Sequence, residues 1–386
     1  MLATGRDSLI LIRGFRRPSG KCPHGLPEHS FIYARQYKRL MLDSKERVRA
    51  LDQKDMLGSI EALPKHLADG LRRGRMSGLP RFVPKEIVVC GMGGSAIGGD
   101  LLKAWLEVSS EVPCEVYRSY CLPGHVGRDS LVIVASYSGN TEESLSMFED
   151  ARKKRSKIVA ISAGGQLAKM SDAVSVPFAK LPSGLLPRAS LGYMFGAMLG
   201  VLERSGVVVQ DKQIEEAVRV MGRMTAYCRQ SVPTSDNPAK MVAHELFTCV
   251  PLIIGYGLSR PVAKRWANQI NENGKSMAYS SELPEWDHNE IVGWVKDARS
   301  KGFAAVFLEH DDRQGQMQRR IRATKDVIGR GSSVYSVDAI GLSPLAKMFS
   351  LVIMGDYTSA YLGLLRGEDP SSNEPIDELK AVLSKK

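Results

Sequence analysis

The chain has 386 residues, more than one hydrophobic core usually supports, so its length indicates two domains. Its composition, with 43% hydrophobic and 25% charged residues, is typical of an ordinary globular protein. No apolar run reaches the roughly 18 residues that a membrane helix needs, so neither a membrane protein nor a membrane partner is expected.

The net charge of +11 could indicate a nucleic-acid-binding protein, but its distribution argues against one. More than half of it comes from residues 1–40, which carry eight Lys and Arg residues against Asp7 and Glu28. A nucleic-acid site should lie on a folded face with aromatic or motif support, and the sequence offers none. A mild positive balance elsewhere suits a small anionic substrate.

Residues 1–40 differ from the rest of the chain because they contain several prolines and glycines and no helical period. They are predicted to form a flexible basic tail. A wrongly assigned start site and a targeting segment remain open as alternatives. The apolar stretch 9–12 is too short for a secretory signal.

The six cysteines occur without the CxxC or CxxH spacing of a metal site. A long chain of this kind is expected to be reduced and cytoplasmic, with no metal and no cofactor. The cysteines are Cys22, Cys90, Cys114, Cys121, Cys228 and Cys249.

A polar helical pattern opens at Met41, and strand and helix signals alternate from about residue 86. In the first half, continuous apolar runs predict strands, which alternate with helices at 100–106 and 142–153. Apolar strands separated by helices favour an α/β fold with a doubly wound parallel sheet covered on both faces. The predicted strands are 86–90, 114–117, 131–136 and 157–161.

The second half repeats this order of elements, and a break in the pattern near residue 210 separates two predicted domains, 41–210 and 211–386. Both are expected to be doubly wound. The predicted strands are 251–255, 303–308 and 333–337, and the predicted helices are 189–204, 212–228, 239–249, 260–271, 314–328 and 343–365.

The first motif, GMGGSAIGGD at 91–100, lies where a strand ends and a helix begins. Loops at this position bind anions because free backbone NH groups and the helix dipole point outward, and glycines allow a close approach. Ser95 adds a hydroxyl donor. A dinucleotide loop is the competing interpretation, but Ala96 replaces its third glycine and Arg118 stands where a ribose-binding acid is expected. A purely structural turn is the other alternative.

The second motif, SYSGNTEES at 136–144, again follows a strand. Ser136, Ser138 and Thr141 supply three hydroxyls in six residues, more than a helix cap needs. Thr141 alone could act as an N-cap, which leaves capping as the structural alternative. Because neighbouring parallel strands present their carboxyl ends to one crevice, this loop is expected to lie beside Ser95.

Together with LPSGLLPRAS at 181–190 and NQINENGKSMAYSSELPEWDHNEI at 268–291, these motifs resemble the sugar-isomerase domain proteins. More narrowly, they resemble the bifunctional phosphoglucose/phosphomannose isomerases, over about residues 45–385. The resemblance implies two sugar-isomerase-like domains and interconversion of glucose 6-phosphate and mannose 6-phosphate with fructose 6-phosphate. It also implies a homodimer with a shared active site.

The resemblance further implies roles for particular residues. Arg188 would stabilise an enediolate, Glu272 would be the base, and His288 would open the sugar ring. Thr358, in the last long helix, would govern acceptance of mannose as well as glucose. The family usually has Ala where this chain has Gly274. The implied phosphate-binding residues are Gly94, Ser95, Ser136, Ser138 and Thr141.

Aldose–ketose isomerisation needs such groups, because one carboxylate can carry a proton between C1 and C2 through a cis-enediol(ate). An imidazole can exchange a proton near neutral pH, and a fixed cation can stabilise developing oxyanion charge. The plain alternatives are a solvated helix-end Glu272, a structural His288 and a surface cation at Arg188.

The main functional alternative is a non-catalytic sugar-phosphate sensor or regulator. Such a protein commonly carries a DNA-binding helix-turn-helix, which residues 1–85 do not show. The isomerase half of an amidotransferase would need an N-terminal domain with a nucleophilic cysteine, which is also not found.

Overall fold

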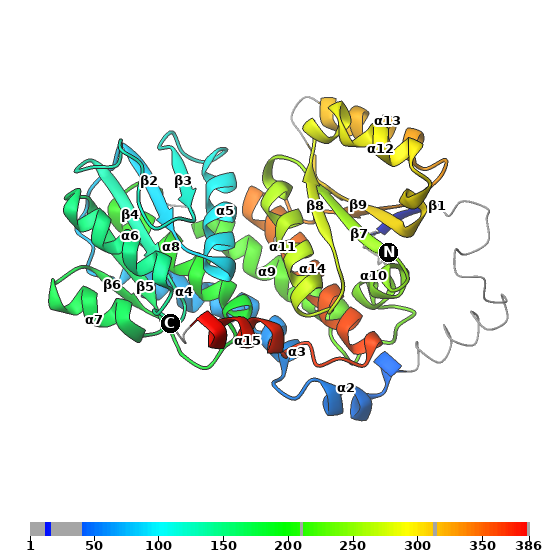
Figure 1. Cartoon of the computed structure of the whole chain (residues 1–386), viewed down its shortest axis with the longest axis horizontal. Helices are drawn as coiled ribbons and strands as arrows, with labels where there is room; N and C mark the ends of the chain where they lie inside the picture. The colour runs from blue at the N-terminus through cyan, green and yellow to red at the C-terminus, as the bar shows by residue number, and fades with distance from the viewer. Residues whose placement is uncertain (1–11, 17–40, 209–210, 312–314, 384–386) are drawn as a thin grey trace, which may run out of the picture. The chain divides into compact units, whose positions relative to one another are not determined.

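The computed structural model describes residues 12–16, 41–208, 211–311 and 315–383 (Figure 1). The chain forms two compact units, each made of separate stretches. The first-sheet unit comprises Asp52–Arg229, Gly341–Phe349 and the chain from Ser371 onward; the second-sheet unit comprises the chain up to Leu51, Gln230–Ile340 and Ser350–Pro370. This division differs from the boundary predicted near residue 210, because helix α9 (Asp211–Cys228) belongs to the first-sheet unit.

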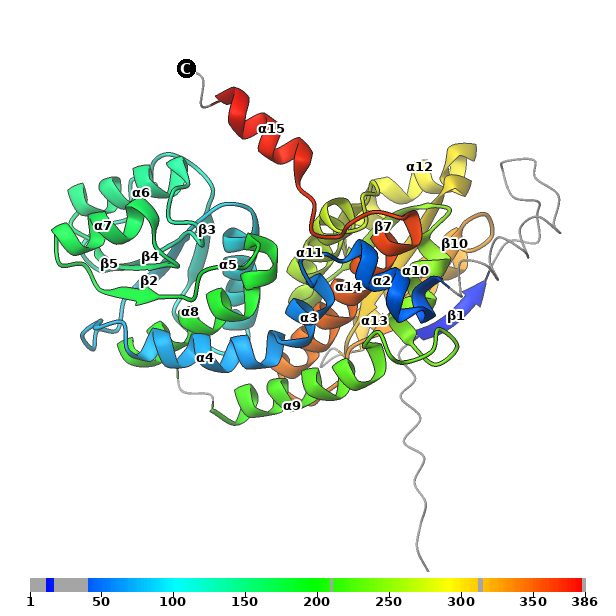
Figure 2. The ribbon, with the colours of Figure 1, turned by 90° about the horizontal axis from the view of Figure 1, so that it is seen from below.

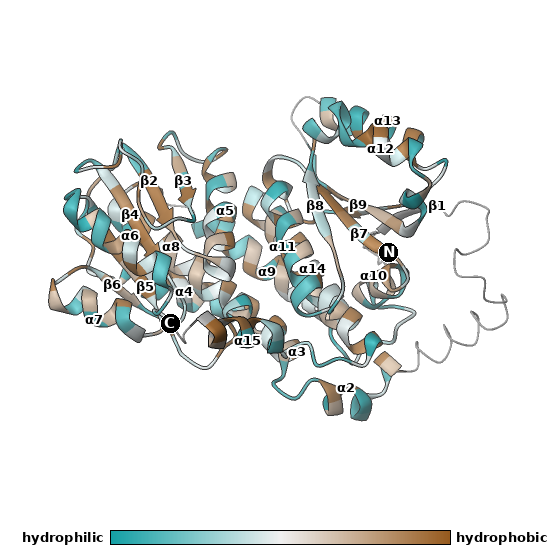
Figure 3. Cartoon of the chain, viewed as in Figure 1, coloured by the Kyte–Doolittle hydropathy of each residue, from teal (hydrophilic) through white to brown (hydrophobic). Residues whose placement is uncertain are grey.

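The first sheet has five parallel strands in the order β3-β2-β4-β5-β6. Its central strands are continuous apolar runs with buried side chains, shown in brown in Figure 3, as expected for a sheet covered on both faces. Their ends agree with the predicted strands to within one residue. The strands are β2 (Glu86–Cys90), β3 (Cys114–Tyr117), β4 (Ser130–Ala135), β5 (Lys157–Ser162) and the unpredicted β6 (Phe178–Lys180).

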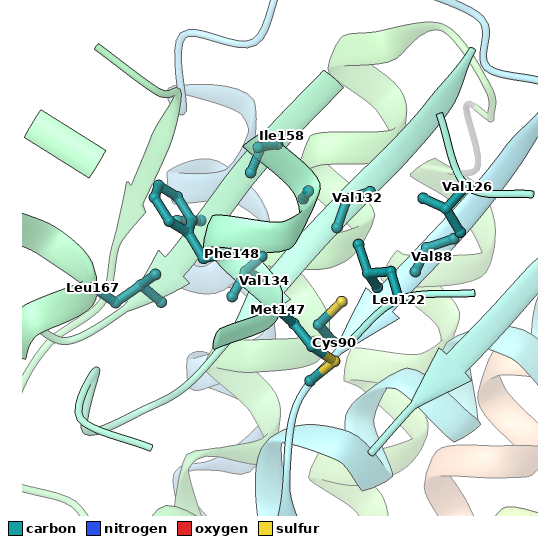
Figure 4. Close-up of a cluster of buried hydrophobic side chains, with 12 residues drawn as sticks. Val88, Cys90, Leu122, Val126, Val132, Val134, Met147, Phe148, Ile158 and Leu167 are labelled. Carbon is teal, nitrogen blue, oxygen red and sulfur yellow. The ribbon is translucent and has the colours of Figure 1, made fainter. Parts of the chain in front are cut away.

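Helices pack on both faces of this sheet. On one face lie α6 (Glu142–Lys153) and α7 (Gly165–Ala173), whose apolar side chains meet alternate residues of β2, β4 and β5 in the cluster of Figure 4. The helices α5 (Gly93–Leu106) and α8 (Leu191–Ser205) contact the same sheet, and Gly99 of α5 lies against Val89, the strand position between two residues of that cluster. The predicted doubly wound arrangement is therefore confirmed.

Helix α4 (Leu63–Arg75) lies side by side with α8 (Figure 2). Glycines on both helices allow the two backbones to approach closely. A Cβ atom at Gly70 would lie 2.5 Å from the carbonyl oxygen of Tyr193, and one at Gly196 would overlap the carbonyl oxygen of Leu67. Any side chain at these positions would push the helices apart.

The second sheet has the order β1-β10-β9-β7-β8, and all its strands are parallel except β1. The unpredicted strand β1 (Ile12–Arg16) pairs antiparallel with β10 and corrects the prediction that residues 1–40 are only a tail. The rest of that segment, with Cys22, lies outside the described residues. The other strands are β7 (Val250–Gly255), β8 (Tyr279–Glu282, also unpredicted), β9 (Phe303–Glu309) and β10 (Ser333–Asp338).

One face of the second sheet packs on α13 (Gln316–Ile328) and on two tryptophans, Trp286 and Trp294, the latter from α12 (Glu290–Lys296). The helix α14 (Pro344–Arg366) is long and apolar enough to cross a membrane, which corrects the expectation that no such apolar run exists. The most apolar stretch of this helix is wholly buried inside the protein. The remaining helices are α2 (Lys45–Leu51), α3 (Met56–Glu61), α10 (Pro238–Leu246), α11 (Arg260–Glu272) and α15 (Glu374–Leu383).

We expect Gly196→Ala to lower the unfolding temperature, because the added methyl group cannot fit between α4 and α8; overpacking of this kind typically costs roughly 1–3 kcal/mol. Gly222, on the exposed side of α9, is a matched control, since no atom lies within 4 Å of its Cβ position. Gly222→Ala should leave stability unchanged or raise it by up to about 1 kcal/mol. Thermal unfolding followed by circular dichroism measures both, and equal losses in the two variants would contradict the close-packing argument.

Candidate active site

The strands β2 and β4 are neighbours in the first sheet, with Cys90 opposite Val134. From β2 the chain continues through α5 to β3 on one side, and from β4 it continues through α6 to β5 on the other. The loops that follow β2 and β4 therefore diverge at a switch point of the sheet. In open α/β sheets, ligands bind in the crevice at such a point.

The loop after β2 leads directly into α5, which begins at Gly93, seven residues before the predicted helix. Gly94 and Ser95 thus lie in the first helical turn, where the backbone NH of Ser95 donates to the carbonyl oxygen of the N-cap residue Met92 at 3.0 Å. A Cβ atom at Gly94 would lie 2.8 Å from the carbonyl oxygen of Pro187, so the loop packs tightly on the segment that carries Arg188. The hydroxyl of Ser95 accepts a hydrogen bond from the backbone NH of Tyr137 at 3.2 Å. The two motif loops therefore touch, as predicted.

The loop after β4 is folded around its own hydroxyl groups. Ser136 Oγ and Thr141 Oγ1 are hydrogen-bonded at 2.9 Å, and the backbone NH of Gly139 donates to Ser136 Oγ at 3.2 Å. Thr141 is the N-cap residue of α6, but its side chain makes no capping bond. Capping therefore does not explain this threonine, and its hydroxyl is directed to Ser136 instead.

The loop after β5 is a third part of this edge, and the sequence patterns considered above did not indicate it. Gly139 has a φ of 71°, and a Cβ atom there would overlap the carbonyl oxygen of Gly164. The side chain of Asn140 accepts a hydrogen bond from the backbone NH of Gln166 at 2.9 Å. The Gly-Gly pair that follows the apolar run 157–161 is the sequence signal that could have found this loop.

Arg188 lies in a short 3-10 turn, Pro187–Ser190, and only 3% of its surface is exposed. Its Nη1 donates a hydrogen bond to Asn373 Oδ1 at 2.6 Å. The interpretation of Arg188 as a surface cation is therefore wrong. A buried guanidinium keeps its charge, so it acts as a fixed positive group within the first-sheet unit.

Glu272 is the last residue of α11 and is half-buried. The next residue, Asn273, donates from Nδ2 to Ser359 Oγ of α14 at 3.0 Å, which holds this helix end in place. Gly274 has a packing reason, because a Cβ atom there would lie 2.6 Å from the carbonyl oxygen of Ile270. The glycine that departs from the family pattern therefore lets the chain turn tightly directly after Glu272.

A buried ion pair joins α11 to α14. Arg265 Nη2 lies 2.7 Å from Asp356 Oδ2, with side-chain exposures of 3% and 4%. Gln269 Nε2 donates to Asp356 Oδ1 at 3.1 Å. Arg265 and Gln269 lie on the helix that ends at Glu272, so this cluster fixes the helix that presents the candidate base.

His288 ends a 3-10 turn, Glu285–His288, and its side chain is exposed. The acidic residues beside it are bonded elsewhere. Asp287 accepts from Arg320 at 3.2 Å and from Thr324 at 3.0 Å, and Glu290 accepts from Ser281 at 2.8 Å. These two carboxylates are therefore bonded to groups other than the His288 ring.

Thr358 lies on α14 and is completely buried. Its hydroxyl makes no hydrogen bond within the part of the chain that the structure describes. A buried hydroxyl without a partner is uncommon and points to a cause such as a role in function or an ordered water molecule.

The predicted residues thus fall into two groups. The phosphate-loop residues and Arg188 come together in the first-sheet unit, whereas Glu272, His288 and Thr358 belong to the second-sheet unit. Within the described ranges, no group of three or more His, Cys, Asp or Glu side chains could hold a metal ion, and the five cysteines there form no disulfide. Burial raises the pKa of the Cys114 thiol to about 12, as expected for a cysteine that serves as a core residue.

Comparisons with known families and structures agree with this architecture. Residues 82–176 match the family described as SIS domain, and residues 235–383 match the bacterial phospho-glucose isomerase C-terminal SIS domain. A hypothetical protein from Thermus thermophilus is similar in structure, with a TM-score of 0.69, 18% identity and coverage of 92% of this chain and 97% of that chain. A glucose-6-phosphate isomerase like protein from the same organism has a TM-score of 0.59, 16% identity and coverage of 86% and 98%. The fold is that of a two-domain SIS protein.

Relatives in sequence narrow the class to one family. The bifunctional phosphoglucose/phosphomannose isomerase of Caldicellulosiruptor bescii is 41% identical over 303 residues, which cover 78% of this chain and 89% of the relative. The protein of the same name from Aquifex aeolicus is 33% identical over 303 residues, covering 78% and 91%. The chain belongs to the bifunctional phosphoglucose/phosphomannose isomerase family and is an aldose–ketose isomerase.

We expect Asp356→Asn to destabilise the protein strongly, because it leaves the buried Arg265 charge without its counter-ion; breaking a buried pair typically costs about 3–5 kcal/mol. The exposed pair of Arg260 and Glu282, 3.5 Å apart, provides the control. Glu282→Gln should change stability by less than about 1 kcal/mol. Urea unfolding compares the two, and similar midpoints would show that the cluster does not hold α11 to α14.

Proposed function

We propose that this enzyme interconverts glucose 6-phosphate and fructose 6-phosphate, and mannose 6-phosphate and fructose 6-phosphate, by metal-independent proton transfer through a cis-enediol(ate). The observation that carries the proposal is the contact between two loops rich in hydroxyl groups at the switch point of the first sheet. The names and the identity of the relatives support this substrate class.

The substrate phosphate binds, in this proposal, to the hydroxyls of Ser95, Ser136, Ser138 and Thr141 and to backbone NH groups near Gly94. The first turn of α5 supports this role, since helix N-termini attract anions through free NH groups and the helix dipole. Ser138 is exposed, so its hydroxyl is accessible to a ligand. Hydrogen bonds from these donors to an anionic phosphate would be stronger than those between neutral groups.

Glu272 serves as the base that removes the proton from C2 of the aldose and returns it to C1. Its position at the end of a helix fixed by Asn273 and by the Arg265–Asp356 pair supports this role, because a base must be held in a constant geometry. Half-burial keeps its carboxylate reachable while limiting its motion.

Arg188 stabilises the negative charge that develops on the enediolate oxygens. Its burial supports this role, because an oriented cation away from bulk water stabilises a transition state more than a solvated cation does. His288 opens the sugar ring by exchanging a proton with the ring oxygen. Its exposure supports a further proposal, that two copies form a homodimer in which His288 of one copy serves the site of the other.

Thr358 governs the acceptance of mannose phosphate beside glucose phosphate. The buried hydroxyl supports this role, since a polar group with no partner among the described residues is able to hydrogen-bond a substrate hydroxyl or a water molecule beside it. We also propose that the enzyme needs no metal and works in the cytoplasm.

Glu272→Gln tests the chemistry, because it keeps the size of the side chain and removes its basicity. We expect isomerisation to fall by at least about 10²-fold while phosphate binding survives. The measurement is exchange of the C2 proton with solvent, followed by NMR, in chelator-treated buffer. Exchange at the wild-type rate would show that Glu272 is not the base. Wild-type activity that is lost on chelation and restored by zinc would contradict the metal-independent mechanism.

Replacing Ser138 by Ala and Thr141 by Val in one protein should raise KM strongly, because two donors to the phosphate are lost, whereas kcat should change less. The control is Ser146→Ala on α6, whose hydroxyl donates to the carbonyl oxygen of Tyr120 outside the loops. Steady-state kinetics with fructose 6-phosphate measures both. An unchanged KM in the folded double variant would remove these hydroxyls from the phosphate site.

A further inference from the structure

Tyr137 stands between the two candidate phosphate ligands Ser136 and Ser138, yet its side chain is directed away from solvent, with 6% of its surface exposed. Its hydroxyl makes two hydrogen bonds. It donates to the carbonyl oxygen of Pro182 at 2.8 Å and accepts from the backbone NH of Leu185 at 3.0 Å. A single side chain therefore joins the loop after β4 to a segment nearly 50 residues further along the chain.

That segment is the one that carries Arg188. It begins at Leu181, whose NH donates to the carbonyl oxygen of Ser162 at 2.8 Å, and it ends in the turn where Ser190 Oγ donates to Pro187 O at 2.8 Å. Between these ends, Tyr137 supplies a side-chain partner for the backbone at Pro182 and Leu185. On its other side, the backbone at Pro187 rests against Gly94.

The main chain of Tyr137 contacts the first loop as well, because its NH donates to Ser95 Oγ. Tyr137 thus bonds through its backbone to the loop after β2 and through its hydroxyl to the Arg188 segment. These hydrogen bonds therefore connect the residues proposed to bind the phosphate with the segment that carries the buried cation Arg188.

We propose that Tyr137 is a positioning residue that sets the place of Arg188 relative to the bound phosphate. This inference rests on the proposed role of Arg188. The sugar phosphate is held at one end by the hydroxyl loops, so the distance from those loops to the guanidinium decides whether the cation meets the enediolate oxygens. Tyr137 fixes that distance by bonding both parts of the site.

The hydroxyl is suited to this role because it is satisfied in both directions, as donor and as acceptor. Burial raises the pKa of Tyr137, so the hydroxyl keeps its proton, and with it the bond to Pro182, throughout the neutral range. Without the hydroxyl, the carbonyl of Pro182 and the NH of Leu185 would each lose a partner at a half-buried place, and the segment would no longer be tied to the loop after β4. A displacement of about 1 Å in a positioned catalytic group can cost about 10²-fold in rate.

The test is Tyr137→Phe, which removes only the hydroxyl. We expect kcat for the isomerisation of fructose 6-phosphate to fall by about 10-fold or more, within the loss that such a displacement can cause. The inhibition constant of inorganic phosphate should change by less than about 3-fold, since the phosphate donors stay in place. Tyr193→Phe is the matched control, because no hydrogen bond to its hydroxyl occurs among the described residues and its ring stacks on His66. It should keep wild-type kcat.

A second measurement separates positioning through Arg188 from general loosening of the fold. In an Arg188→Ala background, Tyr137→Phe should cause no further loss of kcat, since there is no guanidinium left to misplace. Independent losses that multiply would overturn the inference, as would an unchanged kcat in Tyr137→Phe or an equal weakening of inorganic phosphate binding. Full activity in Arg188→Ala alone would instead contradict the proposed role of Arg188, and the inference would fall with it.

Discussion

The candidate phosphate site depends on the parallel pairing of β2 with β4. Glu86 lies opposite Ser130 and Cys90 opposite Val134, so the two strands end at the same level of the sheet. A shift of one residue would turn each buried side chain of β4 to the other face, and the apolar residues on both faces would no longer meet their helices. The hydrophobic core therefore fixes the register, and the register brings Ser95 within hydrogen-bonding distance of the loop after β4.

Glycines allow the segments at this edge of the first sheet to pack closely against one another. A Cβ atom at Gly94 would meet the carbonyl oxygen of Pro187, and one at Gly139 would meet that of Gly164. The start of α5 therefore packs on the Arg188 segment, and the loop after β4 packs on the loop after β5, backbone against backbone. Hydroxyl groups held in such a framework lose little freedom when an anion binds, which lowers the entropic cost of binding. The same framework extends to Arg188 through the close contact of Gly94 with Pro187 and through the hydroxyl of Tyr137.

In the second-sheet unit, a buried ion pair fixes the position of helix α11 against α14. An apolar contact between α11 and α14 would stabilise the unit equally well or better, because the desolvation of two buried charges offsets much of their mutual attraction. The polar cluster of Arg265, Gln269 and Asp356 instead allows only one rotation and one register of α11. The guanidinium makes two hydrogen bonds to the carboxylate, from Nε to Oδ1 at 3.0 Å and from Nη2 to Oδ2 at 2.7 Å. A helix that presents a catalytic carboxylate at its end gains from that definition, because slippage along an apolar seam would move the base.

Sequence patterns predicted the central strands of both sheets, because a continuous apolar run between turns is typical of a buried strand; β2 has the predicted ends. The short strands β6 and β8 were missed because neither is an apolar run bounded by turns. The start of α5 at Gly93 was missed because glycines argue locally for a loop, whereas the tertiary structure allows a helix there.

The sequence predicted which residue types the candidate site contains, but it did not predict which side chains form hydrogen bonds with one another. Thr141 has the position of a helix cap, and only the structure shows that its hydroxyl turns to Ser136. The bond between Arg188 and Asn373 joins residues 185 positions apart, and no local period or spacing can indicate such a pair. Local patterns report which side chains a segment can offer, whereas the partners of those side chains are decided by strand order and by where glycines let backbones meet. A motif can therefore contain a positioning residue such as Tyr137, but the role of that residue follows only from the partners that the structure shows.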